Sequence, residues 1–113
     1  MQIQMNSDHR ITGSPQLAGR VQALLRDAFE RYSDRITRVE VRLNDLNGVK
    51  VGSTDKRCLM EARLAGIGPV SANHEAPTVE LAIEGAMEKL ERALGHKLGR
   101  IEATAGGRRS SKA

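Results

Sequence analysis

The chain has 113 residues, with 18 Lys and Arg against 14 Asp and Glu, which gives a formal net charge of +4. This length predicts one domain with a modest core, and the basic balance favours a polyanionic partner without proving one. Phe29 and Tyr32 are the only aromatic residues, so a protein that reads RNA by stacking bases on exposed rings is not expected. Cys58 is the only cysteine, which excludes an internal disulfide and a thiolate metal cluster.

The sequence also argues against a membrane protein and against an enzyme. No apolar run approaches the roughly 20 residues that cross a bilayer, and the first residues lack the basic start and apolar centre of a signal peptide. We therefore expect a cytoplasmic protein. The three histidines lie in separate segments, none at metal-ligand spacing, and no nucleophile, base and orienting group can be placed together. We expect no catalysis, no metal or other cofactor and no small-molecule substrate.

Periodicity predicts four strands and two helices. Apolar residues alternate with polar ones in the predicted strands, which cover 2–6, 36–44, 57–64 and 70–74. The first helix is expected to begin at Ser14-Pro15 and to end near Tyr32, because apolar residues recur there at helical spacing. Pro77-Thr78 begins the second helix, which weakens at Gly95 and Gly99.

Turn residues and composition predict how these elements are connected and where the domain ends. Asn47-Gly48 marks one turn, and Gly66–Pro69 marks another between the last two strands. The element order β-α-β-β-β-α predicts an α+β fold, a two-layer sandwich in which two helices pack on one face of a four-stranded sheet. Residues 1–100 form this domain, and residues 101–113 are expected to be a basic, disordered tail. His74 and Cys58, each in a predicted strand, are interpreted as structural residues.

The charges of the second helix separate by sign when the sequence is wound at 100° per residue. Its apolar residues, from Val79 to Leu94, share one face. The basic flank of that face consists of Lys89, Arg92, His96 and Arg100, and the acidic flank consists of Glu80, Glu84, Glu88 and Glu91. A basic edge of this kind favours a phosphate backbone as the ligand. The alternative is a solvated helix face, in which Arg92 forms an i,i+4 ion pair with Glu88.

Two stretches resemble a known family. The run Y-S-D-R-I-T-R-V-E-V-R-L, residues 32–43, resembles the segment leading into the second strand of the ribosome hibernation-promoting factors and ribosome-associated inhibitor A proteins. The run L-A-I-E-G-A-M-E-K-L-E-R-A-L-G-H-K, residues 81–97, is similar to the second helix of that family. The resemblance implies a fold like the double-stranded-RNA-binding domain with one additional N-terminal strand. It also implies a short form, without the C-terminal domain that dimerises ribosomes in long members.

The same resemblance implies a function. Family members bind the small ribosomal subunit between head and body, in the channel for mRNA and tRNA, through basic residues that contact the rRNA backbone. They block initiation and preserve idle ribosomes during stress or stationary phase. Carried over to this chain, the expected rRNA-binding residues are Lys89, Arg92, His96, Lys97 and Arg100 of the second helix, with Arg20, Arg26, Arg31 and Arg35 as a group from the first. Gly95 and Thr78-Val79 depart from the family pattern.

A different class of function stays open. The outward face of the predicted sheet carries both signs of charge, and it is suited to an acidic protein partner or to a dimer. Modulation of an alternative sigma factor belongs to this reading. The residues on that face are Arg38, Arg42, Arg57 and Arg63, with Glu40 and Glu61 among them. Whether the protein pairs ribosomes or holds single inactive ones also stays open.

Overall fold

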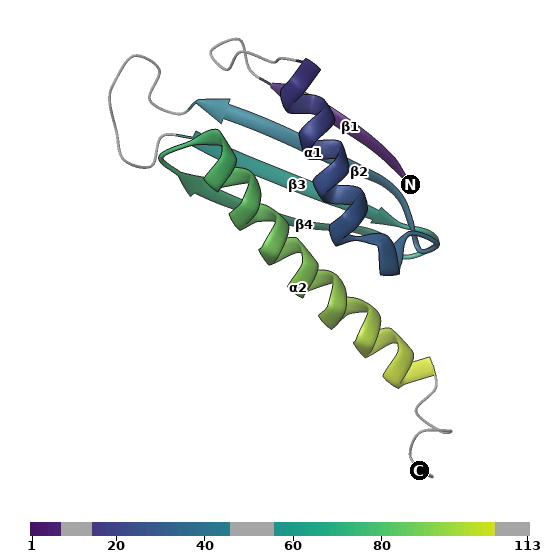
Figure 1. The fold of residues 1–113 in the computed structure, drawn as a ribbon. Helices are drawn as coiled ribbons and strands as arrows, with labels where there is room; N and C mark the ends of the chain where they lie inside the picture. Colours follow the sequence, from purple (N-terminus) through teal and green to yellow (C-terminus); the bar gives the residue numbers. More distant parts are fainter. Residues whose placement is uncertain (8–14, 46–55, 106–113) are drawn as a thin grey trace.

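The computed structural model describes residues 1–7, 15–45 and 56–105, with side chains as far as residue 100. The strands are β1 (Gln2–Ser7), β2 (Ile36–Asp45), β3 (Lys56–Leu64) and β4 (Gly68–Ala76). The helices are α1 (Pro15–Ala28), a short 3-10 turn η1 (Glu30–Tyr32) and α2 (Val79–Ala105). The predicted α+β fold and its element order are therefore confirmed (Figure 1).

The four strands form one sheet in the order β1-β2-β3-β4. β1 runs parallel to β2 because α1 carries the chain back between them, whereas β2, β3 and β4 pair antiparallel. Both helices lie on the same face of the sheet, with α2 over β3 and β4 and α1 towards β1 (Figure 1). The described part of the chain places no helix on the opposite face, which is why the strands alternate apolar and polar residues.

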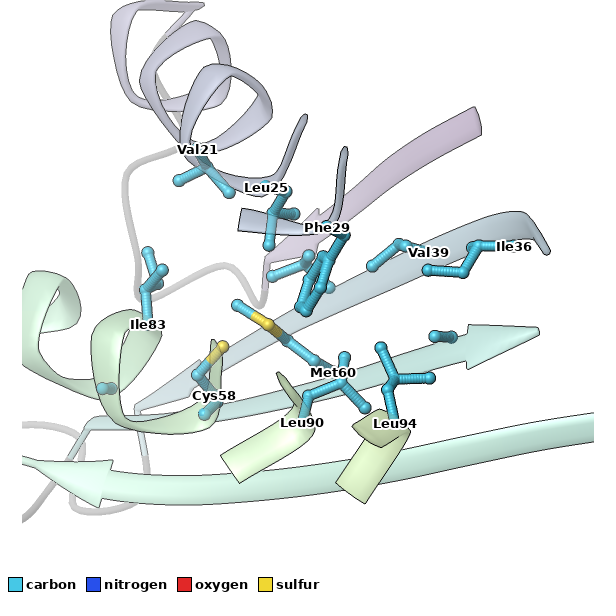
Figure 2. Close-up of a cluster of buried hydrophobic side chains, with 14 of the residues drawn as sticks. Val21, Leu25, Phe29, Ile36, Val39, Cys58, Met60, Ile83, Leu90 and Leu94 are labelled. Carbon is cyan, nitrogen blue, oxygen red and sulfur yellow. The ribbon is translucent and has the colours of Figure 1, made fainter. Parts of the chain in front are cut away.

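The core fills the space between the helices and the sheet. Val21 and Leu25 of α1 and Leu90 and Leu94 of α2 point towards Met60 of the sheet (Figure 2). The inward residues of β2 and β3 are buried at every second position, as the period predicted: Val39, Val41, Leu43, Cys58, Met60, Ala62 and Leu64. Burial of these side chains supplies the main favourable term in folding.

Three element boundaries differ from the sequence prediction. α1 ends at Ala28 rather than near Tyr32, because Phe29 leaves helical geometry (φ −110°, ψ 19°) and η1 tightens the approach to β2. β4 covers Gly68–Ala76, longer than the predicted 70–74, because β3 provides a pairing partner along its whole length. The predicted turn at Gly66–Pro69 is correspondingly shorter, and its two glycines have left-handed φ values of 73° and 115°.

α2 also continues further than expected. Gly95 and Gly99 were expected to weaken it, yet the helix runs on to Ala105, into the segment predicted as tail. Leu94 and Leu98 are buried, so tertiary packing offsets the roughly 1 kcal/mol that each glycine costs a helix. The predicted features at Ser14, Asn47-Gly48 and residues 106–113 lie outside the described residues.

Candidate nucleic-acid interface

The basic flank of α2 lies along the β4 edge of the sheet. Thr78 caps the start of α2, because its side-chain oxygen accepts a hydrogen bond from the amide of Leu81 (3.1 Å). The apolar face of α2 fixes the orientation of the remaining helix. Lys89, Arg92 and His96 are exposed beside that face. The ammonium of Lys89 donates to the backbone carbonyl of Asn73 on β4 at 3.3 Å. This bond connects the helix directly to the β4 edge strand.

The acidic flank of α2 faces α1 and η1. The carboxylate of Glu91 lies 3.6 Å from the guanidinium of Arg31 in η1. Nearer the start of the helix, Glu80 and Glu84 line a hollow between the two helices together with Arg20 of α1. The predicted separation of charge on α2 therefore has a tertiary cause: the acids face the arginines of the first helical segment. Lys89, at the β4 edge, lies on the flank that faces away from α1, whereas Arg92 and His96 lie near Arg31 of η1.

A second hollow, of about 550 Å³, lies between η1 and the middle of α2. It is lined by Arg31, Glu88, Glu91, Arg92, Gly95 and His96. The Arg31 guanidinium lies 4.9 Å from the centre of the Tyr32 ring, an arrangement that allows a cation–π interaction. A Cβ at Gly95 would make ordinary van der Waals contact with the Tyr32 oxygen, at 3.4 Å. Two arginines and a histidine thus surround one open hollow.

Both carboxylates of this hollow are engaged with arginines. Glu91 faces Arg31, and Glu88 lies 3.9 Å from Arg92 one turn along the same helix. The second pair is the i,i+4 contact that the sequence offered as the alternative explanation of Arg92. All four side chains are at least 38% exposed, so solvent screens both pairs and each contributes at most about 1 kcal/mol to stability.

The remaining basic residues from the sequence prediction do not share one surface. Arg26 lies at the opposite edge, where its guanidinium donates to the carbonyl of Met1 at 3.3 Å. Arg20 lines the hollow near the start of the helices, and Arg35 is half-buried in the turn before β2. Lys97 is half-buried and Arg100 exposed on the last turns of α2, which extend beyond the sheet (Figure 1). The structure therefore brings together Arg31, Arg92 and His96, and it places Lys89 on the same flank as Arg92.

The sequence carries no signal that pairs Arg31 with Glu91 or Tyr32 with Gly95. Sixty or so positions separate the members of each pair, and no local periodicity reports a contact of that range. The spacing of Glu88 and Arg92 was a usable signal, because i and i+4 are neighbours on any helix. Gly95 was predicted to weaken the helix and to depart from the family pattern, and in the structure a Cβ there would only touch the Tyr32 oxygen.

The uncovered sheet face carries its charges in rows across the strands. The register places Arg38 opposite Arg63, and two residues further on it places Glu40 opposite Glu61. Like charges directly opposite one another are unfavourable in a sheet. The two glutamates line a shallow hollow together with Arg42, Leu59 and Ser71. This face is the second candidate surface for a partner.

Within the described ranges, no group of three or more His, Cys, Asp or Glu side chains is placed to hold a metal ion. Burial raises the pKa of the Cys58 thiol to about 12, so this cysteine is protonated and unreactive at neutral pH. None of the helices in the described residues is both long enough and apolar enough to span a bilayer.

The sequence matches a known protein family, and the fold is similar to those of two solved structures. Residues 3–102 match the family described as Sigma 54 modulation protein / S30EA ribosomal protein, and the chain belongs to that family. Its fold is similar to a ribosomal subunit interface protein from Coxiella burnetii, with a TM-score of 0.62 and 22% identity over 87% of this chain and 99% of that one. It is also similar to the N-terminal domain of Thermus thermophilus Protein Y, with a TM-score of 0.64 and 25% identity over 81% and 93% of the two chains. No curated protein sequence matches the chain.

Proposed function

We propose that this protein is a ribosome hibernation factor of the cytoplasm. In this proposal it binds the small ribosomal subunit in the channel for mRNA and tRNA, blocks initiation and stabilises idle ribosomes under stress or in stationary phase. Binding is to the rRNA backbone and requires no chemical reaction. Family membership supports a ribosomal partner, and one structural neighbour is itself named a ribosomal subunit interface protein.

The observation that carries the proposal is the exposed basic flank of α2. Lys89, Arg92 and His96 are exposed along one side of a helix that is anchored on the core by Leu90 and Leu94. A row of basic side chains on a helix held by the core can follow a phosphate backbone without reading base sequence. With two aromatic residues, of which Phe29 is fully buried, the protein offers charge and shape rather than base stacking.

Co-sedimentation with isolated small ribosomal subunits at near-physiological salt tests the proposal. Stoichiometric pelleting, reduced by excess mRNA and tRNA, is the expected result. We expect the charge-reversal variant Lys89→Glu with Arg92→Glu to lose binding while it keeps its fold, because neither side chain is buried. Failure of the wild-type protein to pellet, or equal competition by ordinary duplex RNA, contradicts the proposed site on the ribosome.

The matched control is Arg38→Glu with Arg63→Glu on the uncovered sheet face. It changes the net charge by the same amount as the α2 variant, but it lies on the other face of the sheet. We expect this control to bind almost normally. Loss of binding in both variants indicates an effect of net charge alone, and retained binding in the α2 variant overturns the assignment of the site.

The second candidate function is regulation through protein contacts at the uncovered sheet face. The opposed pairs Arg38–Arg63 and Glu40–Glu61 favour it, because a partner with complementary rows would relieve their repulsion. Modulation of a sigma factor, which the family description mentions, would be of this kind. Loss of partner binding in the sheet-face variant, with the α2 variant unaffected, would select this function.

A further inference from the structure

We propose that the hollow beside Gly95 binds one phosphate group of the RNA, and that Glu88 and Glu91 are counter-ions which this phosphate must displace. The inference rests on the proposed function, since it concerns how the same surface engages RNA. It adds that the free protein neutralises part of its own binding site. The carboxylates thereby set a threshold that weak, non-specific RNA contacts do not overcome.

The geometry supports displacement rather than permanent pairing. The nitrogen–oxygen distances are 3.6 Å for Arg31–Glu91 and 3.9 Å for Arg92–Glu88. Charge-assisted hydrogen bonds at full strength are shorter, about 2.7–2.9 Å. The arginine side chains are 66% and 74% exposed, so both are free to turn towards a ligand that enters from solvent. The pairs are loose enough to exchange partners.

The charge balance of the hollow gives the carboxylates their effect. Two guanidinium groups and two carboxylates line it, so with His96 neutral its formal charge is zero. A phosphate gains little attraction from such a site until the carboxylates move aside. Once they do, both guanidinium groups can donate paired hydrogen bonds to its oxygens, a geometry that suits arginine better than lysine.

Gly95 provides the space for the ligand. It lies between Arg92 and His96 on α2 and lines the hollow with backbone alone. A Cβ at this position would make ordinary contact with the Tyr32 oxygen at 3.4 Å, and without one this part of the hollow stays open. The volume of about 550 Å³ accommodates a phosphodiester group with its water.

A double-mutant cycle on small-subunit binding tests the inference. Neutralising the carboxylate in Glu91→Gln should tighten binding by up to about fivefold, the value of releasing one exposed ion pair. The same substitution in an Arg31→Gln background should give no gain, because the cation that Glu91 holds is absent. The matched control is Glu84→Gln, which removes the same charge from α2 outside this hollow. Its effect should be small and equal in both backgrounds.

A gain from Glu91→Gln that persists in the Arg31→Gln background, or that Glu84→Gln equals, overturns the inference, since either result is an effect of net charge. A second readout does not depend on the ribosome. Inorganic phosphate titrated into the isotopically labelled protein should shift the amide signals of Gly95 and His96, at lower concentration in Glu91→Gln than in wild type. If the protein does not bind subunits, the proposed function fails, but this titration still shows whether the hollow binds phosphate. Absence of shifts in both proteins overturns the phosphate site.

Discussion

The imidazole ring of His74 on β4 lies directly against the backbone of Gly85 on α2. A Cβ added at Gly85 would overlap three ring atoms of His74, so only glycine fits where the helix crosses this strand. The contact sets how closely α2 approaches β4, and with it the position of the basic flank. The structural role expected for His74 agrees with this packing.

We expect Gly85→Ala to lower the free energy of unfolding by about 1–3 kcal/mol, because the added methyl group forces the ring or the helix to move. Gly99→Ala in the same helix is the matched control, since nothing lies within 4 Å of its added Cβ. It should raise stability by up to about 1 kcal/mol through helix propensity. Urea denaturation measures both. Equal effects of the two substitutions would show that His74 does not constrain the helix. In a His74→Ala background, where the ring is absent, Gly85→Ala should lower the free energy of unfolding by less than it does in wild type.

Cys58 should be inert in the folded protein and should make stability depend on alkaline pH. Burial raises the pKa of its thiol to about 12, so the folded state resists forming the thiolate. The unfolded chain, with a thiol pKa of 9.0, releases this proton more readily. The contribution to stability is therefore complete below pH 9 and is lost as the pH rises from there towards 12.

The measurement is the free energy of unfolding at pH 8 and at pH 10.5 in wild type and in Cys58→Ala. The fall between the two values should be smaller in the variant, because other groups titrate equally in both proteins. In addition, a thiol reagent at pH 8 should modify Cys58 only after denaturation. Rapid modification of the native protein would contradict the burial of this side chain.

Two leucines of α2 should differ sharply in their effect on stability. Leu94 is fully buried against the sheet (Figure 2), whereas Leu81 is 48% exposed. Leu94→Ala should cost about 2–5 kcal/mol, because it leaves a cavity in the core. Leu81→Ala should change the free energy of unfolding by no more than about 0.5 kcal/mol. Thermal unfolding compares the two, and a comparable loss at Leu81 would indicate that this leucine is covered by a partner copy in solution.

Two arginines close together in the sequence should differ in RNA binding. Arg31 belongs to the hollow on α2, whereas Arg26 lies at the β1 edge and bonds to Met1. Arg31→Gln should weaken small-subunit binding and reduce the slope of log affinity against log salt by about one, as expected for one lost phosphate contact. Arg26→Gln should change neither quantity. Binding isotherms at three salt concentrations test this, and equal slopes for the two variants would place the RNA elsewhere on the molecule.

The sequence by itself determined the elements and the inward faces of this protein. Alternation in 36–44 and 57–64 and the apolar face of the second helix were readable because they repeat over short distances. The basic flank was readable for the same reason, since Lys89, Arg92 and His96 are neighbours on any regular helix. The sequence did not correctly predict where each helix and strand ends. The second helix continues past Gly95 because packing of Leu94 and Leu98 outweighs local propensity.

Only the tertiary structure decided which of the basic residues lie together. Arg31 and Arg26 are five positions apart, yet one faces α2 and the other faces β1, because α1 ends and η1 turns the chain between them. Contacts such as Arg31 with Glu91 and His74 with Gly85 join residues whose separation depends on how the layers pack. Periodicity fixes the direction of a side chain relative to its own element, and packing between elements determines what it meets there.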